Sequence, residues 1–298
     1  MIAAEDLHLL LRQKLGTPYY KNSSTSLFLG DAHDLLDRLP AELIDLTITS
    51  PPYNVGKEYE QPTAIDDYVQ WCHTWISDIY RVTRPAGSFW LNLGYFTLPL
   101  RATAIPIAYL LWRQIPFYLL QEIIWNYGAG VACKKMFSPR NEKLLWYVKD
   151  AQQYTFNLDD VRDPNVKYPH QKKNGRLKCN PLGKNPTDVW QIPKVTSGAK
   201  RSSPERTPHP AQFPLALVDR IVKASSNRGD ILLDPFVGSG TVAVSGMAAQ
   251  RYVIGFDRER KYLDIAAQRL EAQRIHENAT VSDNPERSNE VPKENTQS

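Results

Sequence analysis

A glycine-rich turn between a short apolar run and a helical pattern constrains the fold of this chain most. The apolar run 231–233 leads directly into Asp-Pro-Phe-Val-Gly-Ser-Gly-Thr (234–241), and a helical pattern begins near Val242. Glycines at such a bend let the backbone pass close to a ligand, and the following helix presents free N–H groups to it. The next apolar run ends at Asp257. This succession predicts a βαβ unit of the nucleotide-binding kind.

The βαβ unit is predicted to bind a nucleotide-like cofactor. The dinucleotide fingerprint needs a third glycine that this turn lacks, so NAD is the weaker interpretation. Asp257 lies where a carboxylate accepts both hydroxyls of a ribose. Alternatively, it only caps the helix that starts at Arg258. The candidate cofactor-binding residues of the unit are Asp234, Pro235, Phe236, Gly238, Ser239, Gly240, Thr241 and Asp257.

A second group of candidate site residues, Ser50-Pro51-Pro52-Tyr53, ends a strand that the pattern predicts to be buried. The amine of a nucleobase is a poor nucleophile, so a catalyst must offer hydrogen-bond acceptors to both of its N–H groups. Ser50 Oγ and the Pro51 carbonyl can accept these two hydrogen bonds. The two prolines stiffen the corner and add no donors. Tyr53 offers a ring on which an unstacked base can lie. Taken alone, the tetrad could also be a tight turn with a core tyrosine. We predict that these four residues are catalytic.

The remaining sequence alternates strand and helix patterns, which predicts an α/β fold. Helical patterns cover residues 3–15 and 65–82, and the second ends before the Pro85–Gly87 breaker and the strand SFWLNLG. The runs LLQEIIWNYG and KLLWYVKD flank a basic loop and predict a hairpin. The predicted organisation is an N-terminal helical segment (1–26), a catalytic half (27–150), a polar insertion (151–206), a cofactor-binding half (207–276) and a disordered tail (277–298).

The polar insertion carries the positive charge of the chain. Between residues 162 and 206 there are eleven Lys and Arg against three acidic residues, within a total net charge of +4. Such a segment favours phosphate contacts, so a nucleic-acid surface is predicted, although a solvated basic loop is the alternative. The candidate DNA-binding residues are Lys172, Lys173, Arg176 and Lys178.

The motifs TSPPYN and DPFVGSGT resemble those of DNA amino-methyltransferases, the N4-cytosine and N6-adenine enzymes found beside restriction endonucleases. The tetrad precedes the glycine turn, which is similar to the permuted order of the beta class. The resemblance implies a Rossmann-like class I methyltransferase sheet of seven strands, S-adenosylmethionine as cofactor, and target recognition by residues 151–206. It also implies that Asp31 approaches the cofactor adenine and that Pro210 and Pro214 shape the loop near its methionine part.

The resemblance favours cytosine N4 as the methylated atom. Adenine enzymes of this kind usually begin the tetrad with Asp or Asn, where this chain has Ser50, and many look to have Lys where this chain has Phe213. The alternatives are an N6-adenine enzyme, a methyltransferase of RNA or protein, and an inactive DNA-binding homologue. C5-cytosine methylation is excluded, since it uses a thiolate, usually in a Pro-Cys pair, and no proline precedes Cys72, Cys133 or Cys179.

The amino-acid composition limits which other classes of protein the chain can belong to. With 298 residues and 42% hydrophobic residues, the chain can form one large core with an insertion. Three cysteines without a CxxC pair predict neither disulfides nor a metal site. The sequence has no apolar run long enough to span a membrane, which predicts a cytoplasmic protein without a membrane partner. Duplex DNA is the expected partner. A cognate restriction endonuclease is compatible with the sequence, and the protein could act as a monomer or a homodimer.

Overall fold

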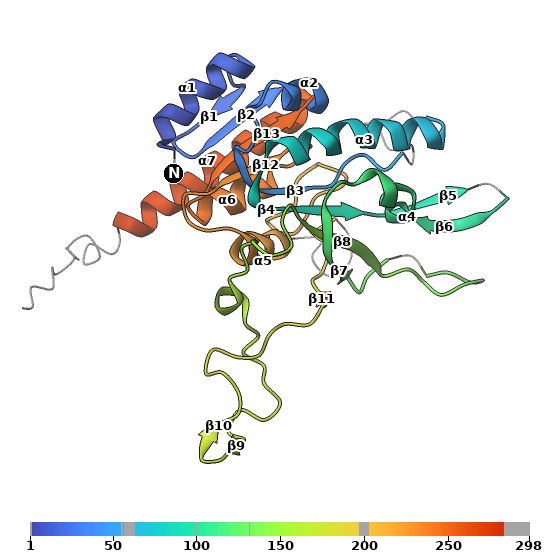
Figure 1. Cartoon of the computed structure of the whole chain (residues 1–298), viewed down its shortest axis with the longest axis vertical. Coiled ribbons are helices and arrows are strands. Elements are labelled where there is room, and N and C mark those ends of the chain that lie inside the picture. The colour runs from blue at the N-terminus through green and yellow to red at the C-terminus, as the bar shows by residue number, and fades with distance from the viewer. Residues whose placement is uncertain are drawn as a thin grey trace, which may run out of the picture.

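The computed structural model describes residues 2–54, 56, 63–98, 100–130, 132–196 and 203–282, and a mixed sheet forms its centre (Figure 1). Over these residues the sheet has nine strands in the order β1-β2-β13-β12-β3-β4-β8-β7-β11. Their bounds are β1 (Tyr20–Lys21), β2 (Thr25–Leu29), β3 (Ile44–Thr49), β4 (Thr83–Leu93), β7 (Tyr118–Asn126), β8 (Asn141–Val148), β11 (Val189–Gln191), β12 (Ile231–Asp234) and β13 (Tyr252–Asp257). Two small hairpins lie outside it, β5 (Tyr95–Leu98) with β6 (Ala102–Pro106) and β9 (Lys172–Lys173) with β10 (Arg176–Leu177).

The sheet has the Rossmann-like character that the sequence predicts, with two more strands than the seven expected. Strands β2, β13, β12, β3 and β4 run parallel, while β8 lies antiparallel between β4 and β7 as the predicted hairpin requires. The additional strands β1 and β11 have two and three residues and form the edges of the sheet. Runs this short carry no periodicity, so the sequence pattern could not predict them.

Helices cover both faces of the sheet (Figure 1). They are α1 (Ala4–Leu15), α2 (Ala32–Asp37), α3 (Ile65–Val82), α4 (Ile107–Leu111), α5 (Leu215–Ser225), α6 (Thr241–Ala248) and α7 (Arg260–Ser282), with short 3-10 turns at Trp112–Gln114 and Leu158–Val161. One core contains side chains of α1 to α4, and the other those of α5 to α7. Alternate residues of a central strand enter opposite cores: Phe89 and Leu91 face α3, whereas Trp90 faces α5. This burial on both faces is typical of a parallel sheet.

Three boundaries differ from the prediction. Helix α3 ends at Val82 as expected, but β4 starts at Thr83, so the predicted breaker Pro85–Gly87 lies in the irregular first part of the strand. Helix α7 continues to Ser282, into the segment predicted as a tail, and residues 283–298 lie outside the described residues. Strand β11 belongs to the main sheet although it lies within the predicted insertion 151–206.

The strand order contains a switch point, at which the connections from two neighbouring parallel strands run in opposite directions. From β3 the chain continues to β4 on one side, whereas from β12 it continues to β13 on the other side. Strands β3 and β12 are neighbours, and Leu232 pairs with Leu46. In open α/β sheets, ligands bind at such a switch point, outside the carboxyl ends of the strands. None of the helices in the described ranges has both the length and the apolarity that crossing a membrane requires.

Candidate active site

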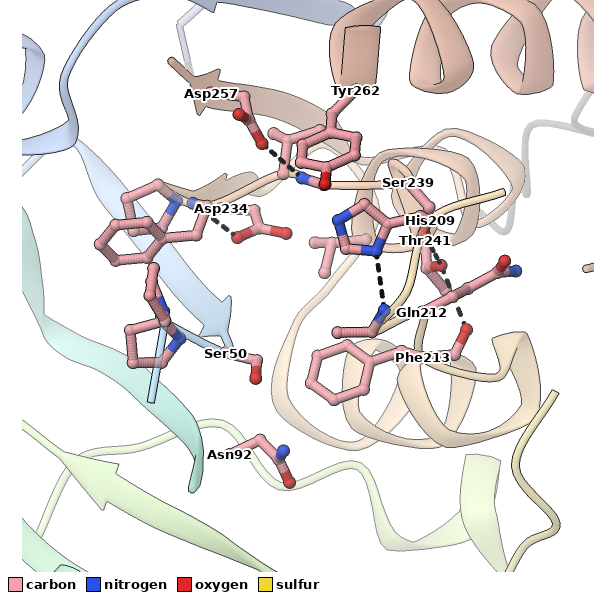
Figure 2. Close-up of a pocket in the computed structure, with 18 of the residues that line it drawn as sticks. Ser50, Asn92, His209, Gln212, Phe213, Asp234, Ser239, Thr241, Asp257 and Tyr262 are labelled. Carbon is pink, nitrogen blue, oxygen red and sulfur yellow. Dashed lines mark hydrogen bonds between the residues drawn. The ribbon is translucent and has the colours of Figure 1, made fainter. Parts of the chain in front are cut away.

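One pocket lies at the carboxyl ends of β3 and β12 and contains nearly all of the predicted catalytic and cofactor residues (Figure 2). The predicted residues that line it are Asp31, Ser50, Pro51, Pro52, Tyr53, Asp234, Pro235, Phe236, Gly238, Ser239, Thr241 and Asp257. Pro210 and Phe213 line it as well. The two motifs, far apart in the sequence, therefore form one cavity.

A buried hydrogen bond joins the two central strands below the pocket. Thr49 Oγ1 donates to Asp234 Oδ1 at 2.9 Å, and the Phe236 N–H donates to the same oxygen at 3.1 Å. Both side chains are buried. Burial raises the pKa of Asp234 to about 7, although the two hydrogen bonds act in the opposite direction. The carboxyl group thus fixes the position of the glycine turn relative to the tetrad.

The two glycines of the turn have different surroundings. Gly238 has φ +51° and lines the pocket, and a Cβ there would lie 2.8 Å from His209 Nε2. Gly240 has φ +75°, precedes α6 and does not line the pocket. A Cβ on Gly240 would lie 2.6 Å from the Cβ of Ala266 in α7. Gly238 therefore allows the His209 ring to lie close to the turn beside the pocket, whereas Gly240 allows a helix to pack behind it.

Asp257 makes the contact expected of a capping residue, and it also lines the pocket, as the predicted ribose contact requires. Its Oδ1 accepts from the Glu259 N–H at 2.9 Å, as a capping carboxylate would, and its Oδ2 accepts from the Gly238 N–H at 2.8 Å. Burial raises its pKa despite these bonds. A carboxylate offers about four acceptor sites, so ribose hydroxyls can still bind. Asp31 likewise lines the pocket while its Oδ1 caps α2 by accepting from the His33 N–H at 2.9 Å.

The tetrad is held by a chain of hydrogen bonds. Ser50 Oγ lies 2.8 Å from the Tyr53 hydroxyl, and Asn92 Nδ2 donates to that hydroxyl at 2.5 Å. The Pro52 carbonyl accepts from the Tyr68 hydroxyl at 2.9 Å. The ring of Tyr53 lies against Gly94, where a Cβ would approach its Cε2 to 2.8 Å. The sequence predicted only a stacking role for Tyr53, and the structure adds a hydroxyl that positions Ser50.

Several pocket residues were not predicted as site residues: Trp71, Asn92, Trp125, Glu142, Lys194, His209 and Tyr262. Asn92 had a signal, because it is a polar residue inside the apolar run FWLNL. The rings of His209 and Tyr262 meet edge to face with centroids 4.3 Å apart, and His209 lies next to Gly238 of the glycine turn (Figure 2). No sequence feature marked Glu142 and Lys194 as pocket residues, since only the fold brings them together.

The predicted DNA-binding residues lie away from the pocket. Lys172, Lys173 and Arg176 form the small β9–β10 hairpin, which lies far from the sheet at the end of an extended segment (Figure 1). Their side chains and that of Lys178 are exposed, and none of the four lines the pocket. The structure thus presents them as a separate basic projection.

This sheet order, with the glycine turn after β12 and the Ser-Pro-Pro-Tyr tetrad after β3, is that of a class I methyltransferase in permuted order. The family model N6_N4_Mtase, described as DNA methylase, matches residues 44–268. The chain is 58% identical over 263 residues to the Type II methyltransferase M.ScaI of Streptomyces caespitosus, covering 88% of this chain and 86% of the relative. The chain therefore belongs to the DNA methylase family of N6 and N4 amino-methyltransferases, of restriction-modification type.

Solved structures show the same fold. PvuII DNA methyltransferase (cytosine-N4-specific) superposes with a TM-score of 0.66 at 20% identity, covering 89% of this chain and 95% of the other. The M1.HpyAVI–SAM complex gives 0.55 at 23% identity, with coverages of 83% and 98%. S-adenosylmethionine is the cofactor of this family. The pocket fits it, because Gly238 leaves backbone accessible and Asp257 presents a carboxylate.

Proposed function

We propose that this protein methylates the exocyclic N4 amine of cytosine in duplex DNA, by direct in-line transfer to an extruded base. The observation that carries the proposal is the single pocket, which joins Ser50 and Tyr53 to the glycine turn and Asp257. A methyl donor on the turn and an amine at the tetrad would meet in this cavity without an intermediate carrier. A covalent enzyme intermediate is not required, and the one fully buried thiol, Cys72, is absent from the pocket lining.

The choice of cytosine rests on the first residue of the tetrad. Adenine enzymes of this family usually have Asp or Asn there, and this chain has Ser50. PvuII DNA methyltransferase, which shares the fold, is described as cytosine-N4-specific. Phe213 also lines the pocket, at the position where many adenine enzymes look to have Lys. These features together support cytosine over adenine.

The residues of this chain would bind and align the amine. The cofactor, when bound, supplies an activated methyl group on its sulfonium. Ser50 Oγ and the Pro51 carbonyl would accept hydrogen bonds from the two N–H groups of the amine and stabilise the positive charge that develops on its nitrogen. The Tyr53 hydroxyl accepts from the Asn92 side chain, and its one proton faces two acceptors, Ser50 Oγ at 2.8 Å and the Asn92 backbone carbonyl at 3.3 Å. When it donates to the nearer Ser50 Oγ, it keeps that acceptor in place.

The exposed basic hairpin supports duplex DNA as the substrate form. Its cations can neutralise phosphates while the pocket receives the extruded base. Because the relative M.ScaI is named a Type II methyltransferase, we further propose that the protein modifies the recognition sequence of a cognate restriction endonuclease.

Analysis of the methylated nucleoside tests the proposal. Purified protein, labelled S-adenosylmethionine and duplex DNA are incubated, and the DNA is digested and analysed by mass spectrometry. N4-methylcytosine is the expected product, and its rate of formation should be strongly reduced with the Ser50→Ala variant. N6-methyladenine as the sole product would overturn the base assignment, and a trapped enzyme–DNA adduct would overturn the direct transfer.

A further inference from the structure

Three polar side chains from separate segments meet beside the tetrad. Asn92 lies near the end of β4, Glu142 near the start of β8, and Lys194 shortly after β11. Asn92 Nδ2 donates to Glu142 Oε2 at 2.8 Å, and Lys194 Nζ donates to Glu142 Oε1 at 2.5 Å. All three line the pocket that contains Ser50 and Tyr53. We call this group the Lys194 cluster.

Asn92 connects the cluster to the tetrad. It is 1% exposed, and its amide group donates both to the Tyr53 hydroxyl and to Glu142. Both amide protons are therefore used, and its Oδ1 has no hydrogen-bond partner. A continuous chain of contacts thus runs from Ser50 through Tyr53, Asn92 and Glu142 to Lys194. The ammonium group is consequently fixed relative to the predicted amine acceptor.

Lys194 retains donor capacity after its contact with Glu142. An ammonium group has three donors and no acceptor. One donor binds Glu142, and the group lies over the ring of Tyr127 at 3.8 Å from its centroid. The two side chains of the ion pair are only 22% and 16% exposed, for Lys194 and Glu142. A pair this shielded gives up much of its hydration and adds little net stability, so a purely structural role explains it poorly.

Cytosine and adenine differ in the groups that lie next to their exocyclic amine. On cytosine the amine is followed along the base-pairing edge by N3 and then by the O2 carbonyl, which are both acceptors. On adenine the amine is followed by the acceptor N1 and then by a C–H group. A donor beside the amine site can therefore bind both bases at the ring nitrogen, but only cytosine offers it a second acceptor.

We propose that Lys194 is a specificity-determining residue that donates to the N3 and O2 edge of the extruded cytosine, with Glu142 and Asn92 as its positioning residues. The inference rests on the proposed function, because it assumes that the amine at Ser50 is N4 of cytosine. Such a contact exists before and during transfer, so it contributes to substrate binding more than to the chemical step. Lys194 should therefore affect KM, whereas Ser50 affects kcat.

Kinetics on modified duplexes test the role of Lys194. The substrates carry the methylation site mapped for the wild-type enzyme, with either cytosine or 3-deazacytosine, which lacks the N3 acceptor, at the target position. Lys194→Met is expected to raise KM on cytosine by about 10–100-fold, since a hydrogen bond to a charged group is lost. Its kcat and cofactor affinity should stay close to wild type. On 3-deazacytosine the difference between the two enzymes should shrink several-fold, and Lys194→Arg should restore part of the binding.

Controls separate the possible failures. Lys143→Met removes a lysine that pairs with Glu122 at 2.8 Å and does not line the pocket, so it should leave KM unchanged. If Lys194→Met weakens binding equally on both bases, Lys194 has only a structural role and the inference is wrong while the proposed function stands. If the wild-type product is N6-methyladenine, the proposed function and this inference both fail.

Discussion

The pocket and the basic hairpin differ in how they are held. In the pocket, side chains from β3, β4, β8, β12 and the segment after β11 are joined by hydrogen bonds between residues far apart in the sequence, such as Thr49 and Asp234. The β9–β10 hairpin consists of two strands of two residues with exposed side chains. Methyl transfer requires a fixed geometry, whereas attraction to phosphates requires mainly charge. Under the proposed function, the chain therefore confines precise positioning to the sheet and places non-specific attraction to phosphates outside it.

The largest effect is expected in the pocket, at Ser50. Ser50→Ala should lower kcat by about 10²–10³-fold, as the loss of a positioned acceptor for a developing charge does. Cofactor affinity should remain near wild type, because Ser50 lies at the tetrad. Single-turnover transfer of labelled methyl groups measures the first quantity and calorimetry the second. Lost cofactor binding in this variant would show that the tetrad and the turn have been assigned the wrong roles.

The pocket is also expected to make the stability of the protein depend on pH, through the buried carboxyl group of Asp234. The folded-state pKa of Asp234 is about 7, above its ordinary value of 3.8, so the folded state binds more protons than the unfolded state between these values. The free energy of unfolding should therefore fall as pH rises through this window, by up to roughly 1.4 kcal/mol per pH unit, and level off above it.

Asp234→Asn should remove this part of the pH dependence. Urea unfolding of wild type and variant at pH values within and above the window measures it, and the difference between the two curves excludes other titrating groups. Asp188→Asn, at an exposed carboxylate in the segment that carries the hairpin, is the matched control for the loss of one carboxylate. Parallel profiles for wild type and Asp234→Asn would contradict the expectation.

Within the pocket, variants of Asp257 are expected to weaken binding of the cofactor. Asp257→Ala removes the acceptor of the Gly238 N–H and the predicted ribose acceptor, so cofactor affinity should fall by about 10-fold or more. Asp257→Asn should lose less, because its amide oxygen can still accept from Gly238. Calorimetric titration with S-adenosylmethionine measures both variants. Unchanged affinity in Asp257→Ala would leave the carboxylate with its capping role alone.

The smallest effect is expected from the hairpin. Replacing Lys172 and Lys173 by Ala should lower the slope of log affinity against log salt by up to about 1.8, since each phosphate contact contributes about 0.9. Exposed lysines in α1 and in the edge strand β1, Lys14 and Lys21, provide a matched double variant that should keep the slope. Binding of fluorescent duplex DNA over a series of salt concentrations gives both values. An unchanged slope in the hairpin variant would place the DNA surface elsewhere.

The sequence predicted those parts of the molecule that depend on local pattern. Periodicity indicated α3 and the long central strands, and turn chemistry indicated the region around Gly238. The Lys194 cluster could not be predicted, because Glu142 lies 50 residues from Asn92 and 52 from Lys194, and only the strand order brings them together. Lys194 was assigned to the basic insertion because its charge matched that composition. Its place in the pocket follows from β11, a strand too short to leave a pattern.

The pairing of β2 with β13 also bears on how the protein is made. Thr25 pairs with Val253 and Leu29 with Asp257, so β2 can form its place in the sheet only after β13 has been synthesised. During synthesis on the ribosome, the tetrad emerges long before the glycine turn, and the central parallel strands cannot all pair until both segments are present. Contacts of such long sequence separation form slowly. Truncated translation products that end before residue 234 would carry the tetrad without the turn, and would therefore lack one half of the pocket lining.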